Sequence, residues 1–191
     1  PITGSNGKTT TKELIHTVLS KKYRTLATRG NLNNHIGVPL TLLNLSRETE
    51  IAIIEMGANH PGEIDFLCQI AQPGYGLITN IGKAHLDGFG GYEGVITAKT
   101  ELYRFLNSNN GKVFLNTEDK LLKKHATGLN IIPYGSFPAD LISVRITADP
   151  FVSMELQLPD QSAIIIESKL YGRYNSGNIL AAVCIGRHFG V

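Results

Sequence analysis

The sequence has little of three things that mark particular classes of protein. It contains only two cysteines, Cys68 and Cys184, far apart and among apolar neighbours, which indicates reduced core thiols of a cytoplasmic protein, not a disulfide or a metal pair. No apolar run approaches the roughly 20 residues of a membrane-spanning helix, and no signal peptide is expected. The net charge of +2 is too small to indicate a nucleic-acid partner. The basic cluster Lys120–Lys124 is interpreted as a solvated helix face, with a binding patch as the alternative.

With 191 residues, the chain is long enough for one substantial core, and one α/β domain is expected. Both ends of the chain are abrupt, because a glycine loop follows Pro1-Ile2-Thr3 at once and Gly190-Val191 directly follows a helical pattern. We therefore expect residues 1–191 to be a single domain of a longer protein.

Strand-like and helical patterns alternate along most of the chain. The predicted strands are 23–28, Ile51–Glu55, Gly76–Ile81, Lys112–Asn116 and Asn130–Tyr134, and the predicted helices are Thr9–Lys22, Val38–Leu45, Pro61–Ala71, Tyr92–Leu106 and Thr117–His125. This alternation predicts an α/β fold with a doubly wound, mostly parallel sheet. Three later runs, Leu141–Thr147, Phe151–Leu158 and Ala163–Ser168, predict a small antiparallel meander before a last helix, Ser176–Phe189.

The strongest pattern is a glycine-rich loop in front of the first helix. It reads Thr3-Gly4-Ser5-Asn6-Gly7-Lys8-Thr9-Thr10. Glycines let the backbone turn its N–H groups inward to hold phosphate oxygens, and the positive end of the following helix dipole points to the same place. Lys8 is expected to reach the β- and γ-phosphates and Thr9 to help hold Mg²⁺. Ile2 replaces the first glycine of the general phosphate-loop pattern, and a glycine-rich turn that caps a helix is the alternative.

Two further strand ends carry chemistry. A carboxylate after four apolar residues, as at Glu55, is costly unless it is paired or bound to a cation, so we predict a Mg²⁺ ligand, with a salt-bridged or helix-capping glutamate as the alternative. His85 follows the next predicted strand and is a candidate for metal or phosphate, or an ordinary loop histidine. Because the carboxyl ends of parallel strands lie at one edge of a sheet, both should meet the phosphate loop there.

Lys99 is out of place on its predicted helix. It lies three or four residues from both halves of an apolar stripe that contains Val95, Ile96, Leu102 and Tyr103. A buried cation needs a partner. The pattern therefore predicts a lysine that the site uses, with a side chain that snorkels to the edge of the stripe as the alternative.

These segments together resemble the central ATPase domain of the Mur ligases of peptidoglycan synthesis. The matching segments are Thr3–Thr10, Asn31–Thr41, Glu55–His60 with Gly62-Glu63-Ile64, Asn80–Gly90 and Gly172–Asn178. They cover nearly the whole chain and are specific in combination. Within the family they are most similar to members that join D-alanyl-D-alanine to UDP-N-acetylmuramoyl-tripeptide.

The resemblance implies how ATP and magnesium are held. Lys8 and the loop backbone would bind the ATP phosphates, while Thr9, Glu55 and His85 would hold two Mg²⁺ ions. Lys99 matches a lysine that related ligases carry as a carbamate, which turns a buried cation into an anion. Lys8, Lys99 and His85 are thus the implied catalytic residues.

The resemblance also implies where the organic parts of the substrates bind. Asn175 and Asn178 match positions that approach the adenine and ribose of the nucleotide. Asn33 and Asn34 would lie near the entrance of the nucleotide-peptide substrate. The implied partners are small molecules only, namely ATP, UDP-N-acetylmuramoyl-tripeptide and D-alanyl-D-alanine, and the protein is expected to be a monomer.

The implied reaction passes through an acyl phosphate, with Mg²⁺ and Lys8 needed to bring two anions together. Family members add an N-terminal domain for the UDP sugar and a C-terminal domain that closes over ATP. Since this sequence contains neither, we expect it to fold and bind nucleotide weakly, but not to ligate.

Two alternatives stay open. A folylpolyglutamate-synthase-like or cyanophycin-synthetase-like ligase shares the loop and the lysine, although the segment Asn31–Thr41 argues against both. A non-catalytic nucleotide-binding module would keep the loop, but it would have no need for Glu55, His85 and Lys99 together.

Overall fold

The computed structural model describes residues 1–83, 86–135, 142–158 and 162–191. Strands β1 (Ile2–Thr3), β4 (Tyr75–Ile78), β5 (Lys112–Asn116) and β6 (Asn130–Tyr134) form a parallel sheet in the order β1-β4-β5-β6, and β2 (Thr25–Ala27) pairs in parallel with β3 (Ile51–Ile53). The Ile2 N–H donates to Ile54 O over 2.8 Å, and the Met56 N–H donates to Ile2 O over 2.8 Å. The segment that follows β3 therefore pairs with β1 on the side away from β4, so β2 and β3 extend the same sheet.

The chain winds outward from β1 in both directions. It first builds β2 and β3 on one side and then β4, β5 and β6 on the other. In such doubly wound sheets ligands bind beyond the carboxyl ends of the strands, at the point where the winding reverses. The end of β1 is this point, and the glycine loop starts there. The predicted fold class is thus confirmed.

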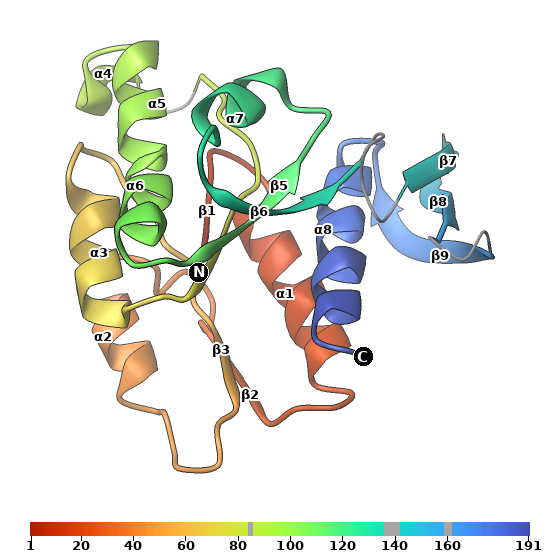
Figure 1. The fold of residues 1–191 in the computed structure, drawn as a ribbon, viewed down its shortest axis with the longest axis horizontal. Coiled ribbons are helices and arrows are strands. Elements are labelled where there is room, and N and C mark those ends of the chain that lie inside the picture. The colour runs from red at the N-terminus through yellow and green to blue at the C-terminus, as the bar shows by residue number, and fades with distance from the viewer. Residues whose placement is uncertain (84–85, 136–141, 159–161) are drawn as a thin grey trace.

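Helices cover both faces of the sheet, as Figure 1 shows. One face carries α1 (Lys8–Leu19) and α8 (Asn175–His188), which pack on each other. The other face carries α2 (Gly37–Leu42), α3 (Glu63–Ala71), α5 (Tyr92–Lys99), α6 (Glu101–Ser108) and α7 (Lys120–His125), with the short α4 (Leu86–Phe89) beside α5. No helix in the described ranges has both the length and the apolar character to cross a bilayer.

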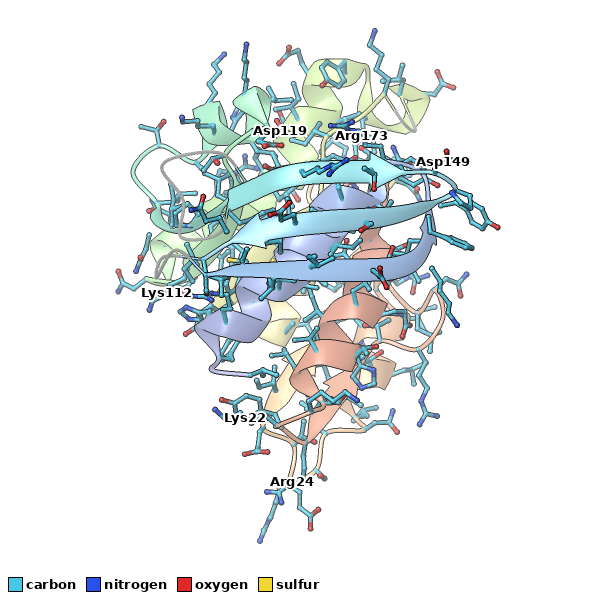
Figure 2. The ribbon with its side chains drawn as sticks, turned by 90° about the vertical axis from the view of Figure 1, so that its right-hand side faces the viewer. Lys22, Arg24, Lys112, Asp119, Asp149 and Arg173 are labelled. Atoms are coloured by element: carbon cyan, nitrogen blue, oxygen red, sulfur yellow. The ribbon has the colours of Figure 1, made fainter. Side chains whose placement is uncertain are left out.

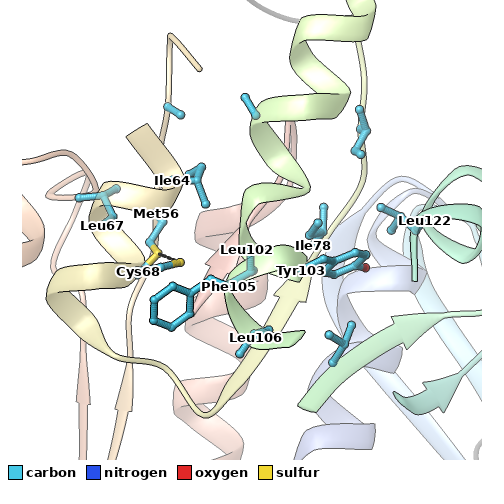
Figure 3. Close-up of a cluster of buried hydrophobic side chains, with 14 of the residues drawn as sticks. Met56, Ile64, Leu67, Cys68, Ile78, Leu102, Tyr103, Phe105, Leu106 and Leu122 are labelled. Carbon is cyan, nitrogen blue, oxygen red and sulfur yellow. Dashed lines mark hydrogen bonds between the residues drawn. The ribbon is translucent and has the colours of Figure 1, made fainter. Parts of the chain in front are cut away.

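The core on the α3 and α6 face is shown in Figure 3. Helix α3 contributes Ile64, Leu67 and Cys68, whose i, i+3, i+4 spacing puts them on one side of the helix. Helix α6 packs closely on β4, where a Cβ at Gly76 would lie 2.5 Å from Leu106 Cδ1. A glycine in the strand is therefore what allows this approach.

The core on the α1 and α8 face is closed by an antiparallel meander. Its strands are β7 (Ile142–Ala148), β8 (Phe151–Gln157) and β9 (Ala163–Tyr171), in the order β7-β8-β9. Val152, Met154 and Leu156 alternate along β8 and point into the core formed with α1 and α8. Figure 2 shows the meander lying over these two helices. The predicted meander is confirmed, although Leu141, the first residue of its first predicted strand, lies outside the described residues.

All the predicted helices differ from the observed ones by one to three residues at an end, and in two of them the structure shows the cause. The helix predicted over Tyr92–Leu106 is interrupted at Thr100, whose hydroxyl donates to Ile96 O over 2.8 Å and divides it into α5 and α6. A threonine bonded back to the preceding turn bends a helix, and this competes with a single regular helix. Helix α7 begins at Lys120 and not at Thr117, because the Asp119 carboxylate caps the Leu121 and Leu122 N–H groups.

The predictions of a solvated basic helix face and of cysteines in the core are confirmed. Lys120, Lys123 and Lys124 are exposed on α7. Cys68 and Cys184 are both buried, in cores on opposite faces of the sheet. The two thiols therefore cannot pair with each other.

Candidate functional site

The glycine loop leads from β1 into α1 with two glycines in the left-handed region. Gly4 has a φ of 140° and Gly7 a φ of 79°, and a Cβ at Gly4 would overlap Thr79 Oγ1. The Lys8 ammonium donates to Gly4 O over 2.9 Å and to Ser5 O over 3.3 Å, so its side chain curls back over the loop. Burial lowers the pKa of Lys8, and the nearby Glu55 carboxylate offsets part of this effect. The loop thus has the shape and charge of an anion site.

The strand end after β4 is hydrogen-bonded directly to this loop. The Ser5 N–H donates to Asn80 O over 3.0 Å, and the Asn6 N–H donates to Asn80 Oδ1 over 3.1 Å. The Gly82 N–H donates to Ser5 Oγ over 2.9 Å. Two of the three predicted strand ends therefore meet, as expected. His85, the residue predicted to act from this segment, lies outside the described residues.

Glu55, at the end of β3, is 1% exposed. Its Oε1 accepts from Thr9 Oγ1 over 3.2 Å and from Asn33 Nδ2 over 2.8 Å, while its buried Oε2 has no hydrogen-bond partner. The described residues hold no cluster of three or more His, Cys, Asp or Glu side chains that could cage a metal. Mg²⁺, however, commonly takes one or two protein oxygens and fills its octahedron with phosphate and water. Thr9 and Glu55 fit that requirement, because each offers an oxygen and Glu55 Oε2 accepts no hydrogen bond.

Lys99 is 3% exposed at the end of α5, which confirms its predicted burial. Its Nζ donates one long hydrogen bond, 3.4 Å, to Ala58 O and lies 5.5 Å from the centre of the Phe89 ring. Burial, and then the positive charge of Lys8, lower the pKa of Lys99 to about 8, against the opposing effect of Glu101 and Glu63. A substantial share of this amine is neutral at pH 8 and can act as a nucleophile.

A cavity of about 470 Å³ lies between the glycine loop and Lys99. Among the residues that line it are Gly4, Ser5, Lys8, Asn33, Asn34 and Lys99. Asn34 Oδ1 accepts from the Gly37 N–H over 2.9 Å at the start of α2, and Asn33 O accepts from the Gly57 N–H over 2.7 Å. The two predicted substrate residues therefore lie on a fixed turn that faces both lysines.

Asn175 and Asn178 occupy a different place. They lie in the first turn of α8, are 6% and 7% exposed, and bond to each other over 2.8 Å. Asn178 Oδ1 accepts from Thr11 Oγ1 over 3.0 Å, and a Cβ at Gly7 would lie 2.8 Å from the same oxygen. The pair thus supports the back of the glycine loop and does not line the cavity. Its predicted contact with adenine and ribose stays a prediction, as do the roles of Asn6 and Thr10.

The sequence analysis missed two buried charges beside the site. Lys12 on α1 is 0% exposed, and Glu101 on α6 is 4% exposed. The Glu101 carboxylate accepts from the Gly62 N–H over 2.6 Å and from the Asp65 N–H over 3.0 Å, and so caps α3 from a neighbouring helix. The sequence feature that identified Lys99 was also present at Lys12, which stands three residues before Ile15 on the apolar stripe of its helix.

The chain is similar to known proteins over almost its whole length, in sequence and in structure. The family model described as the Mur ligase middle domain matches residues 2–186. The UDP-N-acetylmuramoyl-tripeptide--D-alanyl-D-alanine ligase of Bacillus subtilis is 36% identical over 191 residues, which are 100% of this chain and 41% of that protein. A crystal structure of MurF from Acinetobacter baumannii superposes with a TM-score of 0.88 at 38% identity, covering 100% of this chain and 42% of that one.

Another similar solved structure is a complex with ADP. The MurF ligase of Thermotoga maritima in complex with ADP has a TM-score of 0.86 and 31% identity, over 99% of this chain and 44% of that one. The chain therefore spans about two fifths of the length of the relatives it matches. Its fold, its loop sequence and these similarities agree, and the chain belongs to the Mur ligase family as a middle domain.

Proposed function

We propose that this chain is the nucleotide-binding part of a longer cytoplasmic ligase that uses ATP to join D-alanyl-D-alanine to UDP-N-acetylmuramoyl-tripeptide. One domain for the UDP sugar would precede it, and one that closes over ATP would follow. The observation that carries the proposal is the cavity that joins the glycine loop, Lys8 and Lys99 to the Asn33–Asn34 turn. A module that only bound nucleotide would not need the second lysine or the turn.

Lys8 and the loop backbone hold the ATP phosphates in this proposal. Thr9 and Glu55, together with His85, would hold Mg²⁺, which supplies charge neutralisation between the phosphates and the attacking carboxylate. Two observations support this assignment: Glu55 Oε2 accepts no hydrogen bond, and Glu55 Oε1 accepts from Thr9 Oγ1 over 3.2 Å. Asn175 and Asn178, at the start of α8, would contact the adenine and ribose of the nucleotide. Asn178 packs against Gly7 of the loop and donates a hydrogen bond to Asn175.

The reaction then needs two transfers. A carboxylate oxygen of the peptide bonds to the γ-phosphorus as the bond from that phosphorus to ADP breaks, giving an acyl phosphate. The amine of the dipeptide bonds to the acyl carbon, the carbon–oxygen bond breaks, and inorganic phosphate and a proton leave. Lys8 offsets the charge that collects in the first step, and the turn with Asn33 and Asn34 orients the peptide substrate.

Lys99 would act as a carbamate. Its neutral amine bonds to the carbon of CO₂ and releases a proton, which leaves an anion in place of a cation. The support is its single long hydrogen bond to Ala58 O, its place in the cavity, and a pKa of about 8 that leaves neutral amine available. With ¹³C-bicarbonate, NMR of this chain should show a carbamate signal that is absent in Lys99→Met. The same spectrum for both proteins would contradict this role.

Titration calorimetry of this chain with ADP and Mg²⁺ tests the nucleotide site. We expect binding, and at least tenfold weaker binding for Lys8→Met because the phosphates lose their ammonium partner. Lys124→Met, which removes an exposed lysine of α7, is the matched control and should bind as the wild type does. No binding by the folded wild type, or equal loss in both variants, would refute the proposal.

A further inference from the structure

A fully buried lysine sits behind the site, outside the cavity that holds Lys8 and Lys99. The Lys12 ammonium donates to Thr28 O over 2.7 Å and lies 2.9 Å from Glu13 Oε1. It also lies 3.9 Å from Glu55 Oε2. Lysine is almost never fully buried unless it is paired. The carbonyl at the end of β2 fixes the ammonium, so its charge cannot swing into solvent.

The two oxygens of Glu55 are treated differently by their neighbours. Oε1 accepts hydrogen bonds from Thr9 and Asn33, whereas Oε2 accepts none and has the Lys12 ammonium as its charged neighbour. A buried carboxylate without any compensating charge would be costly. Lys12 supplies that compensation from the side of the carboxylate turned away from the hydrogen bonds of Thr9 and Asn33.

We propose that Lys12 is a positioning residue, the internal counter-ion of Glu55, and that it keeps Mg²⁺ from binding firmly there until nucleotide phosphates are present. The proposal rests on the proposed function, in which Glu55 is a metal ligand. A fixed cation 3.9 Å from Oε2 repels a divalent ion at the same carboxylate. The phosphates of the nucleotide bring enough negative charge to offset that repulsion, so metal and nucleotide enter together.

The charged groups around this pair are few among the described residues. Glu13, on α1, lies beyond Lys12 and is 60% exposed, so solvent screens much of its charge. Lys8, from the first turn of the same helix, acts on Glu55 from the cavity side. The carboxylate therefore lies between two lysines of one helix, one toward the phosphates and one toward the protein interior.

Binding of Mn²⁺, a paramagnetic substitute for Mg²⁺, tests the proposal by EPR on this chain with and without ADP. We expect weak Mn²⁺ binding by the wild type alone and strong tightening by ADP. Lys12→Met keeps the length of the side chain and removes its charge, so Mn²⁺ without ADP should bind about tenfold or more tightly, and the tightening by ADP should shrink. A merely structural role would not raise metal affinity, and unchanged Mn²⁺ binding by folded Lys12→Met would overturn the proposal.

A second measurement covers the case in which Lys12→Met does not fold. The double variant Lys12→Met/Glu55→Gln removes both charges and should unfold at a higher urea concentration than Lys12→Met alone, because no unpaired carboxylate remains. Additive effects of the two changes would refute the pairing. Failure of the proposed function has a different signature, because Glu55→Gln would then leave binding of Mn²⁺ with ADP unchanged.

Discussion

Lys12 and Lys99 are both buried, on helices that cover opposite faces of the sheet. Lys12 lies on α1 with a 2.7 Å hydrogen bond to Thr28 O and two carboxylates within 3.9 Å. Lys99 lies on α5 with one 3.4 Å hydrogen bond to Ala58 O and an aromatic ring beside it, and the positive charge of Lys8 adds to the effect of burial on its pKa. Lys12 therefore has carboxylates within ion-pair distance, whereas Lys99 is acted on by Glu63 and Glu101 only from farther away.

The difference shows how burial can be used in two ways. A compensated lysine holds its charge and balances a carboxylate, as Lys12 does for Glu55. An uncompensated lysine loses its proton more easily and becomes a nucleophile, as proposed for Lys99. Sequence position alone does not separate the two cases, because both residues stand on an apolar helical stripe.

Loss of the Lys12 charge should have the largest effect on stability. Lys12→Met removes the lysine that forms an ion pair with the buried Glu55, and breaking a buried pair in this way costs about 3–5 kcal/mol. Urea unfolding at pH 7, followed by circular dichroism, measures the change. A loss below about 1 kcal/mol would show that the two lysines are not different in kind.

Loss of the Lys99 charge should act in the opposite direction and depend on pH. In the folded protein its pKa is about 8, below the ordinary 10.5, so the unfolded chain binds more protons between these values and wild-type stability rises there with pH. Below pH 8 the buried charge costs up to roughly 3 kcal/mol. Lys99→Met should therefore be more stable than the wild type at pH 7, and the gain should fade toward pH 10.5. Urea unfolding at pH 7 and pH 10 that gives equal differences would contradict this.

Removal of the amide that supports Glu55 should cost less. Asn33→Ala deletes the 2.8 Å hydrogen bond to Oε1, and hydrogen bonds to charged groups contribute about 1.5–3 kcal/mol. In a Glu55→Gln background the same change should cost less than in the wild type, as urea unfolding of the four proteins would show. Equal costs in both backgrounds would mean that the Asn33 side chain stabilises the protein by contacts other than its hydrogen bond to Glu55.

The exposed partner of Lys12 should matter least. Glu13 lies 2.9 Å from the ammonium but is 60% exposed, so Glu13→Gln should cost less than about 1 kcal/mol. The loss should disappear in 1 M NaCl, where exposed charges are screened over roughly 3 Å. Thermal unfolding at low and high salt measures this, and a large loss that persists in salt would shift the counter-ion role from Glu55 to Glu13.

The fold could be predicted from the sequence because its signals are local. Alternating apolar runs and helical stripes indicated the parallel sheet, and three short runs indicated the meander. Boundaries failed where a side chain bonded to nearby backbone, as Thr100 does within a predicted helix and Asp119 does in front of one. These bonds compete with regular helix in a way that periodicity does not register.

The candidate site was predicted only in part. The loop was found by its motif, Glu55 by its place at a strand end, Lys99 by the apolar stripe of its helix and Asn33 by the family resemblance. In the structure Thr9 and Asn33 bond to Glu55, and Lys8, Asn33 and Lys99 line one cavity. For Asn178 the sequence offered only the resemblance, which implied a contact with the nucleotide. The structure shows that its side chain packs against Gly7 of the glycine loop.

By itself the sequence determined the phosphate loop, the order of strands and helices, and the presence of ionisable groups at strand ends. Those features follow from residue type and spacing along the chain. Only the tertiary structure decided which lysine has buried partners, because those of Lys12 are Thr28 O and Glu55, 16 and 43 residues away in the sequence, while its sequence neighbour Glu13 is 60% exposed. Charge compensation is a property of distance in space, and spacing along one helix cannot supply it.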